Sequence, residues 1–166
     1  MIAAVDVYYR QETTVATAVL FEEWSSEREI AHFRETVKPA RPYRPGFFFE
    51  RELPCVLKVL GVVKDPLSAI VVDGYVWLNA DNRPGLGGHL YAALGKRIPV
   101  IGVAKNPFRQ GSNAVPVYRG RSRKPLHVTA AGMDPILAAG HIRRMPGPHR
   151  IPTLLKRVDR LSRGIE

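Results

Sequence analysis

Two short, almost fully apolar runs constrain the fold of this chain more than any other feature. Residues 68–74 read Ser-Ala-Ile-Val-Val-Asp-Gly, and residues 99–104 read Pro-Val-Ile-Gly-Val-Ala. A strand without polar alternation is buried on both faces, which requires helices on both sides of its sheet. Apolar residues recur at helical spacing in four further segments, 47–63, 86–95, 134–144 and 153–163. We expect Pro54 to split the first of these helices into two pieces.

The first forty residues are rich in β-branched and aromatic residues, which is typical of strands. Three runs stand out, at residues 2–9, 13–20 and 30–37, and short polar connections between them favour an antiparallel meander. A hairpin is expected from residues 115–118 and 126–129. Strands followed by alternating helices and strands predict a mixed α/β sheet, and the length of 166 residues fits a single domain, 1–166.

The net charge of +10 is distributed unevenly along the chain. Residues 1–95 carry 10 basic and 12 acidic side chains, whereas residues 96–166 carry 15 basic and 3 acidic ones. A strongly basic C-terminal portion favours a polyanion partner such as nucleic acid, although basic surfaces also occur without one. No apolar run approaches the roughly 20 residues that cross a bilayer, and no signal peptide is evident, so we expect a cytoplasmic protein.

Three carboxylates occupy unusual places in these predicted elements. Asp6 lies in the middle of the first strand, Asp73 ends the most apolar strand, and Glu52 follows Arg51 on a helix. Burying a carboxylate is costly unless it is paired, hydrogen-bonded or bound to a metal, and Mg²⁺ prefers carboxylates together with substrate phosphate. Each acid taken singly could be a strand-end or capping group, but convergence of the three would form a metal site.

Basic side chains complete the candidate site. Lys105 follows the apolar strand 99–104, so it should emerge at the same sheet edge as Asp73 and could neutralise charge on a phosphate. Residues 119–124 form the tip of the expected hairpin and carry Arg119, Arg121, Arg123 and Lys124. We expect them to be exposed, either as phosphate contacts or as a solvated charge run.

Several motifs, in the right order, resemble the endonuclease V family. The segment 42–52, Pro-Tyr-Arg-Pro-Gly-Phe-Phe-Phe-Glu-Arg-Glu, is similar to that family's tyrosine between prolines, followed by glycine and an Arg-Glu pair. Other matching pieces are Val-Asp-Val at 5–7, Val-Asp-Gly at 72–74, Gly-Leu-Gly-Gly-His-Leu at 85–90, Ile-Gly-Val-Ala-Lys at 101–105 and, more loosely, residues 150–159. Each motif by itself is a weak indication of the family, whereas the occurrence of all of them in the family's order is a strong one.

The resemblance implies an RNase H-like fold and Mg²⁺-dependent cleavage of a phosphodiester near a deaminated base, inosine, in DNA or RNA, with Mn²⁺ as a substitute ion. The protein would then act as a monomer in nucleic-acid repair or processing. Asp6, Glu52 and Asp73 would be metal ligands, and Lys105 would assist the phosphate chemistry. Tyr43 would be the wedge that replaces an extruded base. The residues lining the base pocket would be Gly46, Phe48, Gly74, Gly85 and Ala104.

Departures from the family pattern leave alternatives open. Asn79 and Met133 stand where the family carries a histidine or a similar polar group, and the segment 106–114 is shorter than usual. These departures are compatible with a nucleic-acid-binding protein that keeps the fold but cleaves poorly. A basic scaffold protein is the third interpretation, and it would leave the placement of the three acids unexplained.

Overall fold

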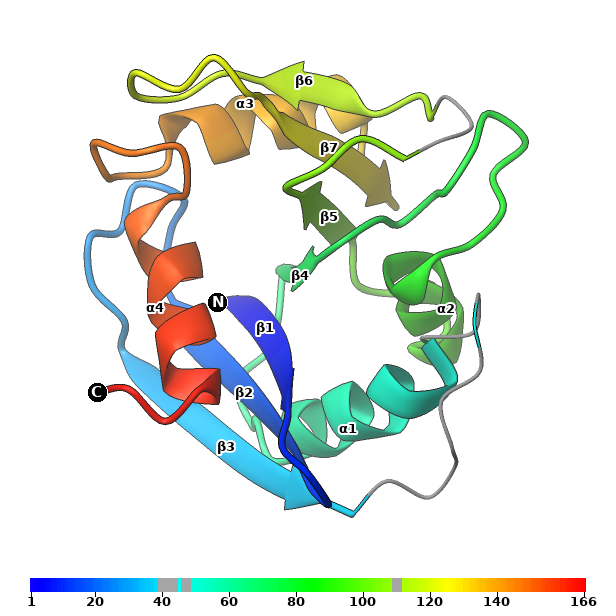
Figure 1. The fold of residues 1–166 in the computed structure, drawn as a ribbon, viewed down its shortest axis with the longest axis vertical. Coiled ribbons are helices and arrows are strands. Elements are labelled where there is room, and N and C mark those ends of the chain that lie inside the picture. Colours follow the sequence, from blue (N-terminus) through cyan, green and yellow to red (C-terminus); the bar gives the residue numbers. More distant parts are fainter. Residues whose placement is uncertain (39–44, 46–48, 109–111) are drawn as a thin grey trace.

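The structure is a computed structural model that describes residues 1–38, 45, 49–108 and 112–166. Its centre is a seven-stranded sheet with the strand order β3-β2-β1-β4-β5-β7-β6 (Figure 1). The strands are β1 (Ile2–Tyr9), β2 (Thr14–Phe21), β3 (Ala31–Val37), β4 (Ala69–Asp73), β5 (Val100–Ala104), β6 (Val115–Val117) and β7 (Leu126–Ala131). β1 to β3 form the predicted antiparallel meander, and β6 and β7 form the predicted hairpin.

The two apolar runs become the inner strands β4 and β5. β4 pairs in parallel with both β1 and β5, and β5 pairs antiparallel with β7. The sheet is therefore mixed, as the sequence predicts. Parallel strands need long crossover connections, and the segments before β4 and before β5 supply them as helices.

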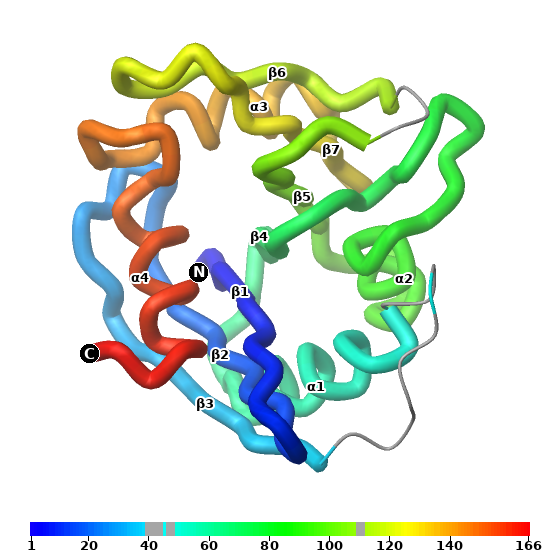
Figure 2. The backbone as a smooth tube through the Cα atoms, viewed as in Figure 1, coloured from blue at the N-terminus to red at the C-terminus, as the bar shows by residue number. Residues whose placement is uncertain are grey.

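Helices cover both faces of the sheet. α1 (Phe49–Gly61) and α2 (Leu86–Ala93) pack on one face, while α3 (Pro135–Arg144) and α4 (Thr153–Ser162) pack on the other. Alternate residues of each strand supply the two cores, so that Ala4 faces α4 and Val5 faces α1. α4 packs against β1 and β2, which places the C-terminal helix beside the first strand (Figure 2).

The expectation that Pro54 splits its helix is wrong. α1 is continuous from Phe49 to Gly61, with Pro54 inside it. A proline in a helix removes one backbone hydrogen bond, here the one to the carbonyl of residue 50. Burial of Val56 and Val59 on the sheet offsets that loss. No helix in the described ranges has both the length and the hydrophobicity needed to cross a membrane.

Candidate active site

Strand register brings Asp6 and Asp73 together. Val5 of β1 pairs with Val72 of β4, so the two aspartates are the next residues on adjacent parallel strands. They belong to the same alternating set as Ala4 and Val71, which face α4, and their side chains therefore point to that face of the sheet. β4 and β5 end at the same edge, which is where the site forms.

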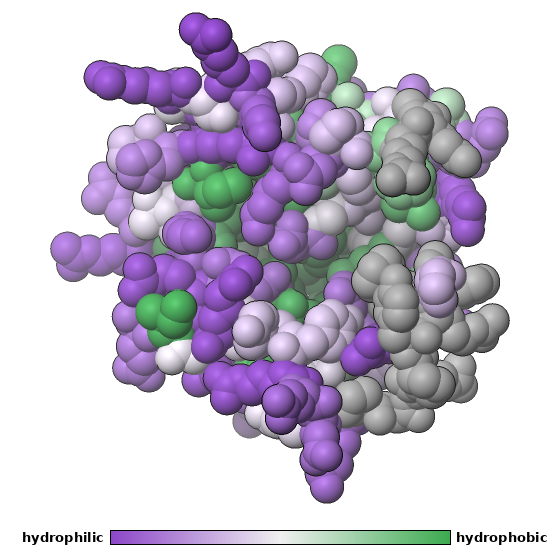
Figure 3. Space-filling model, viewed as in Figure 1, coloured by the Kyte–Doolittle hydropathy of each residue, from purple (hydrophilic) through white to green (hydrophobic). Residues whose placement is uncertain are grey.

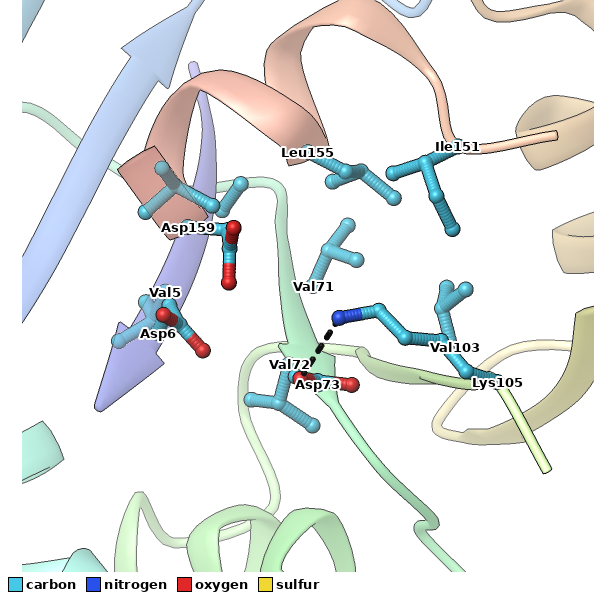
Figure 4. Close-up of a pocket in the computed structure, with 12 residues that line it drawn as sticks. Val5, Asp6, Val71, Val72, Asp73, Val103, Lys105, Ile151, Leu155 and Asp159 are labelled. Carbon is cyan, nitrogen blue, oxygen red and sulfur yellow. Dashed lines mark hydrogen bonds and ion pairs between the residues drawn. The ribbon is translucent and has the colours of Figure 1, made fainter. Parts of the chain in front are cut away.

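Lys105 joins the two aspartates, as the sequence predicts. Asp73 pairs with Val103 of β5, and Lys105 lies two residues further along, on the same face. The Lys105 ammonium lies 3.4 Å from a carboxylate oxygen of Asp73 (Figure 4). Both side chains remain accessible from solvent, with 41% of Lys105 and 47% of Asp73 exposed.

Two cavities meet at the pair of aspartates. The first lies on the α4 face and is lined by Asp6, Asp73, Lys105 and Asp159 together with apolar side chains (Figure 4). The second lies between the sheet and α1 and is lined by Asp6, Asp73 and Glu52. The three acids selected from the sequence are therefore brought to one place, from β1, β4 and α1.

Burial disfavours the ionised form of two of these acids. It raises the pKa of Asp6 from 3.8 to about 6, and the negative charges of Asp73 and Asp159 act in the same direction. A hydrogen bond donated by the Ser162 hydroxyl to Asp6 opposes this rise in pKa. Burial likewise raises the pKa of Glu52 from 4.5 to about 7, with further contributions from Asp6 and Asp73. The ionised acids repel one another, and a bound cation would offset this repulsion.

Asp159 is a site residue that the sequence analysis did not single out. It lies on α4, its side chain is 16% exposed, and it faces Asp6 across the first cavity (Figure 4). The Arg163 guanidinium lies 3.1 Å from its carboxylate. A signal was present in the sequence, because Asp159 is the single acid in the basic segment 143–163. Nothing local indicated that α4 returns to β1.

The donor set fits a hard divalent cation such as Mg²⁺, whose preferred ligands are carboxylate oxygens, water and phosphate. Asp6, Asp73 and Glu52 would hold it, and a bound cation would offset the burial and the neighbouring negative charges that raise the pKa values of Asp6 and Glu52. Across the described ranges, no group of three or more His, Cys, Asp or Glu side chains is arranged so that together they could hold a metal ion. Mg²⁺ does not require such a group, because it usually keeps several waters and uses one or two carboxylates.

The expected base-pocket residues are partly outside the described ranges. Tyr43, Gly46 and Phe48 are not among the described residues. Gly74 follows Asp73 with a positive φ of 112°. Gly85 is buried, and a Cβ atom there would lie 2.5 Å from the Tyr75 carbonyl oxygen. Close backbone packing thus requires glycine at position 85, and the role of these residues toward a base stays a prediction.

Ala104 is buried as well, with 4% of its surface exposed. It ends β5, one residue before Lys105, and pairs with His127 of β7. Its predicted contact with a base is likewise untested.

The hairpin prediction is wrong for Arg119. Its side chain is 6% exposed rather than solvated. The guanidinium donates hydrogen bonds to the carbonyl oxygens of Ile142, Arg143, Met145, Gly147 and Arg150. A guanidinium has five N–H donors, and the end of α3 leaves carbonyls without partners inside the helix, so the two sets satisfy each other. Arg121, Arg123 and Lys124 are exposed, as expected.

Arg150 extends this network to the active site. Its carbonyl accepts a hydrogen bond from Arg119, and its guanidinium donates to the carbonyl oxygens of Lys105 and Pro125. The segment that leads into α4 is thereby attached to the backbone of the site lysine.

The two positions that depart from the family pattern have structural roles here. The Asn79 side-chain oxygen accepts hydrogen bonds from the backbone amides of Asp81 and Arg83, both at 3.1 Å, and so stabilises a turn. Met133 is half-buried and packs against the core under α3. Neither residue lines the two cavities at Asp6.

Comparison with known proteins identifies the family. The family model for endonuclease V matches residues 1–141. Endonuclease V of Streptomyces avermitilis is 31% identical over 98% of this chain and 79% of its own length. Its crystal structure has a TM-score of 0.78 at 29% identity, with 98% of this chain and 79% of that one covered. The Ciona intestinalis endonuclease V structure shares the fold, with a TM-score of 0.83 at 19% identity over 98% and 84% of the two chains. The chain belongs to the endonuclease V family, a nuclease family with an RNase H-like fold.

Proposed function

We propose that this protein is a divalent-metal-dependent endonuclease that hydrolyses a phosphodiester bond near inosine in DNA or RNA. The observation that carries the proposal is the convergence of Asp6, Asp73 and Glu52 at two adjoining cavities, with Lys105 beside Asp73. Three unrelated acids from β1, β4 and α1 would have no reason to meet at one sheet edge, with the pKa values of Asp6 and Glu52 raised by burial.

The carboxylates would hold the cation, Mg²⁺ or its substitute Mn²⁺. A divalent metal supplies an activated water and stabilises charge on the phosphate oxygens. Lys105 adds a positive charge that the substrate can reach, because its side chain is 41% exposed. Asp73 orients that ammonium across 3.4 Å. Ser162 holds the Asp6 carboxylate through its hydroxyl.

Inosine is proposed as the recognised base because of the family relationship. The Ciona intestinalis relative is described in complex with a DNA that contains an inosine. In this chain Tyr43, which stands between Pro42 and Pro45 in the sequence, would replace the stacking of the extruded base, a contribution of ~1–3 kcal/mol. Gly74 lies immediately beside Asp73, so a base held there would place its phosphate close to the carboxylates.

The proposal is tested by incubating the protein with matched oligonucleotides that contain inosine or its unmodified counterpart, each as DNA and as RNA. Cleavage is measured with Mg²⁺, with Mn²⁺ and with EDTA. We expect cleavage near inosine with either ion, no cleavage in EDTA, and much slower cleavage of the unmodified controls. Equal cleavage of both substrates, or cleavage that persists in EDTA, would refute the proposal.

A second candidate function is a nucleic-acid-binding protein with weak cleavage activity. The observation that favours it is the structural use of Asn79 and Met133, which stand where the family has polar side chains. The same assay separates the two candidates, since a binder would retain the inosine oligonucleotide without nicking it.

A further inference from the structure

We propose that a basic groove along α4, which continues from the active-site cavity, holds the phosphate backbone of the substrate on one side of the scissile bond. The groove is defined by the side chains of Lys105, Arg150, Lys156, Arg160 and Arg163. This inference rests on the proposed function and adds the surface through which the nucleic acid leaves the site.

Helical spacing places three of these cations on one face of α4 or just after it. Lys156, Arg160 and Arg163 are separated by four and three residues, so they follow one another along the helix surface. Arg157 faces elsewhere and forms a two-pronged ion pair with Glu29, at 3.0 and 3.2 Å. α4 therefore has one cation neutralised within the protein and a row of three that line an open groove.

The groove is continuous with the site already described. It shares Lys105, Ile151 and Asp159 with the cavity that contains Asp6 and Asp73. It then passes into a further hollow that is also lined by Arg150, Lys156 and Arg160. Hydrophilic side chains cover most of the surface over α4 (Figure 3). A nucleic-acid strand with one phosphate at Lys105 could thus place its next phosphates beside the cations of the groove.

Two of the cations are available to an incoming phosphate. Lys156 is 61% exposed and lies 3.8 Å from Asp159, a distance at which a surface ion pair contributes little. The Arg160 side chain is exposed, and its guanidinium donates a hydrogen bond at 3.3 Å to a main-chain oxygen of the last residue, Glu166. Arg163 is less available to a phosphate, because it contacts Asp159 and lies over the Tyr8 ring.

Charge also argues for a polyanion as the occupant. Besides the site residue Asp159, the residues that line the groove and the further hollow include one acidic residue, Glu166, against the five cations Lys105, Arg150, Lys156, Arg160 and Arg163. Counterion release on phosphate binding favours such a surface independently of base sequence. The groove would therefore contribute affinity and register, while discrimination of the base lies elsewhere.

The test compares Lys156→Ala/Arg160→Ala with a charge-matched control, Lys64→Ala/Arg97→Ala. Lys64 and Arg97 are exposed and precede β4 and β5, so they lie at the sheet edge opposite to the site. Binding of a labelled inosine duplex DNA is measured by fluorescence anisotropy in EDTA over a range of salt concentrations. We expect the slope of log K against log salt to become shallower by about 1.8 in the groove variant, at ~0.9 for each lost phosphate contact, and to be unchanged in the control.

Duplexes shortened on one side or the other of the inosine show which flank of the substrate the groove holds. The defect of the groove variant should persist with one truncated duplex and disappear with the other, because the groove holds one flank only. An unchanged slope in the groove variant, an equal change in the control, or a defect independent of the truncation would overturn the inference. Failure of the wild-type protein to cut inosine DNA with Mg²⁺ is a separate outcome, which would refute the proposed function and leave the binding measurement valid.

Discussion

At the scale of single residues, the unfavourable burial of Asp6 and Glu52 is the main signature of the site. Burial raises their pKa values to about 6 and about 7, and each lies near other carboxylates. Asp73 differs because it is exposed and contacts Lys105. The buried acids would position a cation, and the exposed acid would face the substrate.

Replacement of Asp73 by asparagine should abolish cleavage while leaving nucleic-acid binding largely intact. The change removes a carboxylate from the site, whereas the cations that hold phosphate remain. A nicking assay beside a gel shift measures the two effects. Asp65→Asn is the matched control, since Asp65 is exposed in the loop before β4. If Asp73→Asn cuts as fast as the control, the site is misassigned.

Asp6→Asn should stabilise the metal-free protein, and more at pH 8 than at pH 4.5. The folded state raises the pKa of Asp6 from 3.8 to about 6, so the contribution of this group is fully present below pH 3.8 and is lost as the pH rises through about 6. The asparagine remains neutral and avoids a cost of at most about 3 kcal/mol. Thermal melts in EDTA at the two pH values provide the measurement, and an equal gain at both would contradict the assignment.

At the scale of elements, the hairpin of β6 and β7 carries both a buried basic side chain and exposed ones, and the sequence does not distinguish between them. Arg119 turns inward and connects the hairpin to the end of α3, whereas Arg121, Arg123 and Lys124 face solvent. The inward arginine stabilises the approach to α4, on which Asp159 lies.

Arg119→Met should lower the free energy of unfolding by about 3 kcal/mol or more, because several buried carbonyls lose a charged donor. Arg121→Met is the control and should change it by less than ~0.5 kcal/mol, as is usual for an exposed side chain. Urea unfolding of both variants measures the difference. Equal stability would mean that water replaces the guanidinium without cost.

Alanine at the three exposed hairpin positions Arg121, Arg123 and Lys124 should flatten the salt dependence of DNA binding if the hairpin contacts phosphate. The expected change in the slope of log K against log salt is about 2.7, at ~0.9 for each contact. The same anisotropy titration measures it, with Lys64→Ala/Arg97→Ala as the control. An unchanged slope would show that the hairpin is a solvated charge run.

At the scale of the whole molecule, α4 closes the site by returning to the first strand. It packs on β1 and β2 (Figure 1). It thereby brings Asp159 and the basic groove to Asp6. Charge is distributed unevenly along the sequence, with a nearly neutral first part and a basic last part. In the fold, the acidic residues of the site lie together and basic residues of the last part border them. Binding of a cation should therefore stabilise the fold as a whole.

Mg²⁺ should raise the melting temperature at pH 8, and the rise should grow with the logarithm of its concentration above the dissociation constant. The rise should shrink at pH 5, because the metal must displace protons from Asp6 and Glu52. Differential scanning fluorimetry measures both. Asp65→Asn should retain the shift and Asp73→Asn should lose most of it, so an undiminished shift in Asp73→Asn would argue for binding elsewhere.

The sequence by itself determined most of the sheet and selected four residues that the fold brings together. Apolar runs and β-rich runs predicted the strands, since burial on one or both faces leaves a direct pattern in the residues. Asp6, Asp73 and Lys105 were selected because each interrupts, ends or directly follows such a run, and Glu52 was selected because it follows Arg51 on a helix. The family resemblance, carried by ordered motifs, is confirmed.

Only the tertiary structure decided which polar residues meet. Arg119 and Arg121 are the same residue type two positions apart, yet one is buried and the other exposed, because the end of α3 lies over only one of them. Asp159 joins the site because α4 packs on β1, a contact between segments about 150 residues apart. Pro54 is tolerated because the sheet buries the same helix. Such outcomes depend on long-range packing, which a local pattern of residues does not contain.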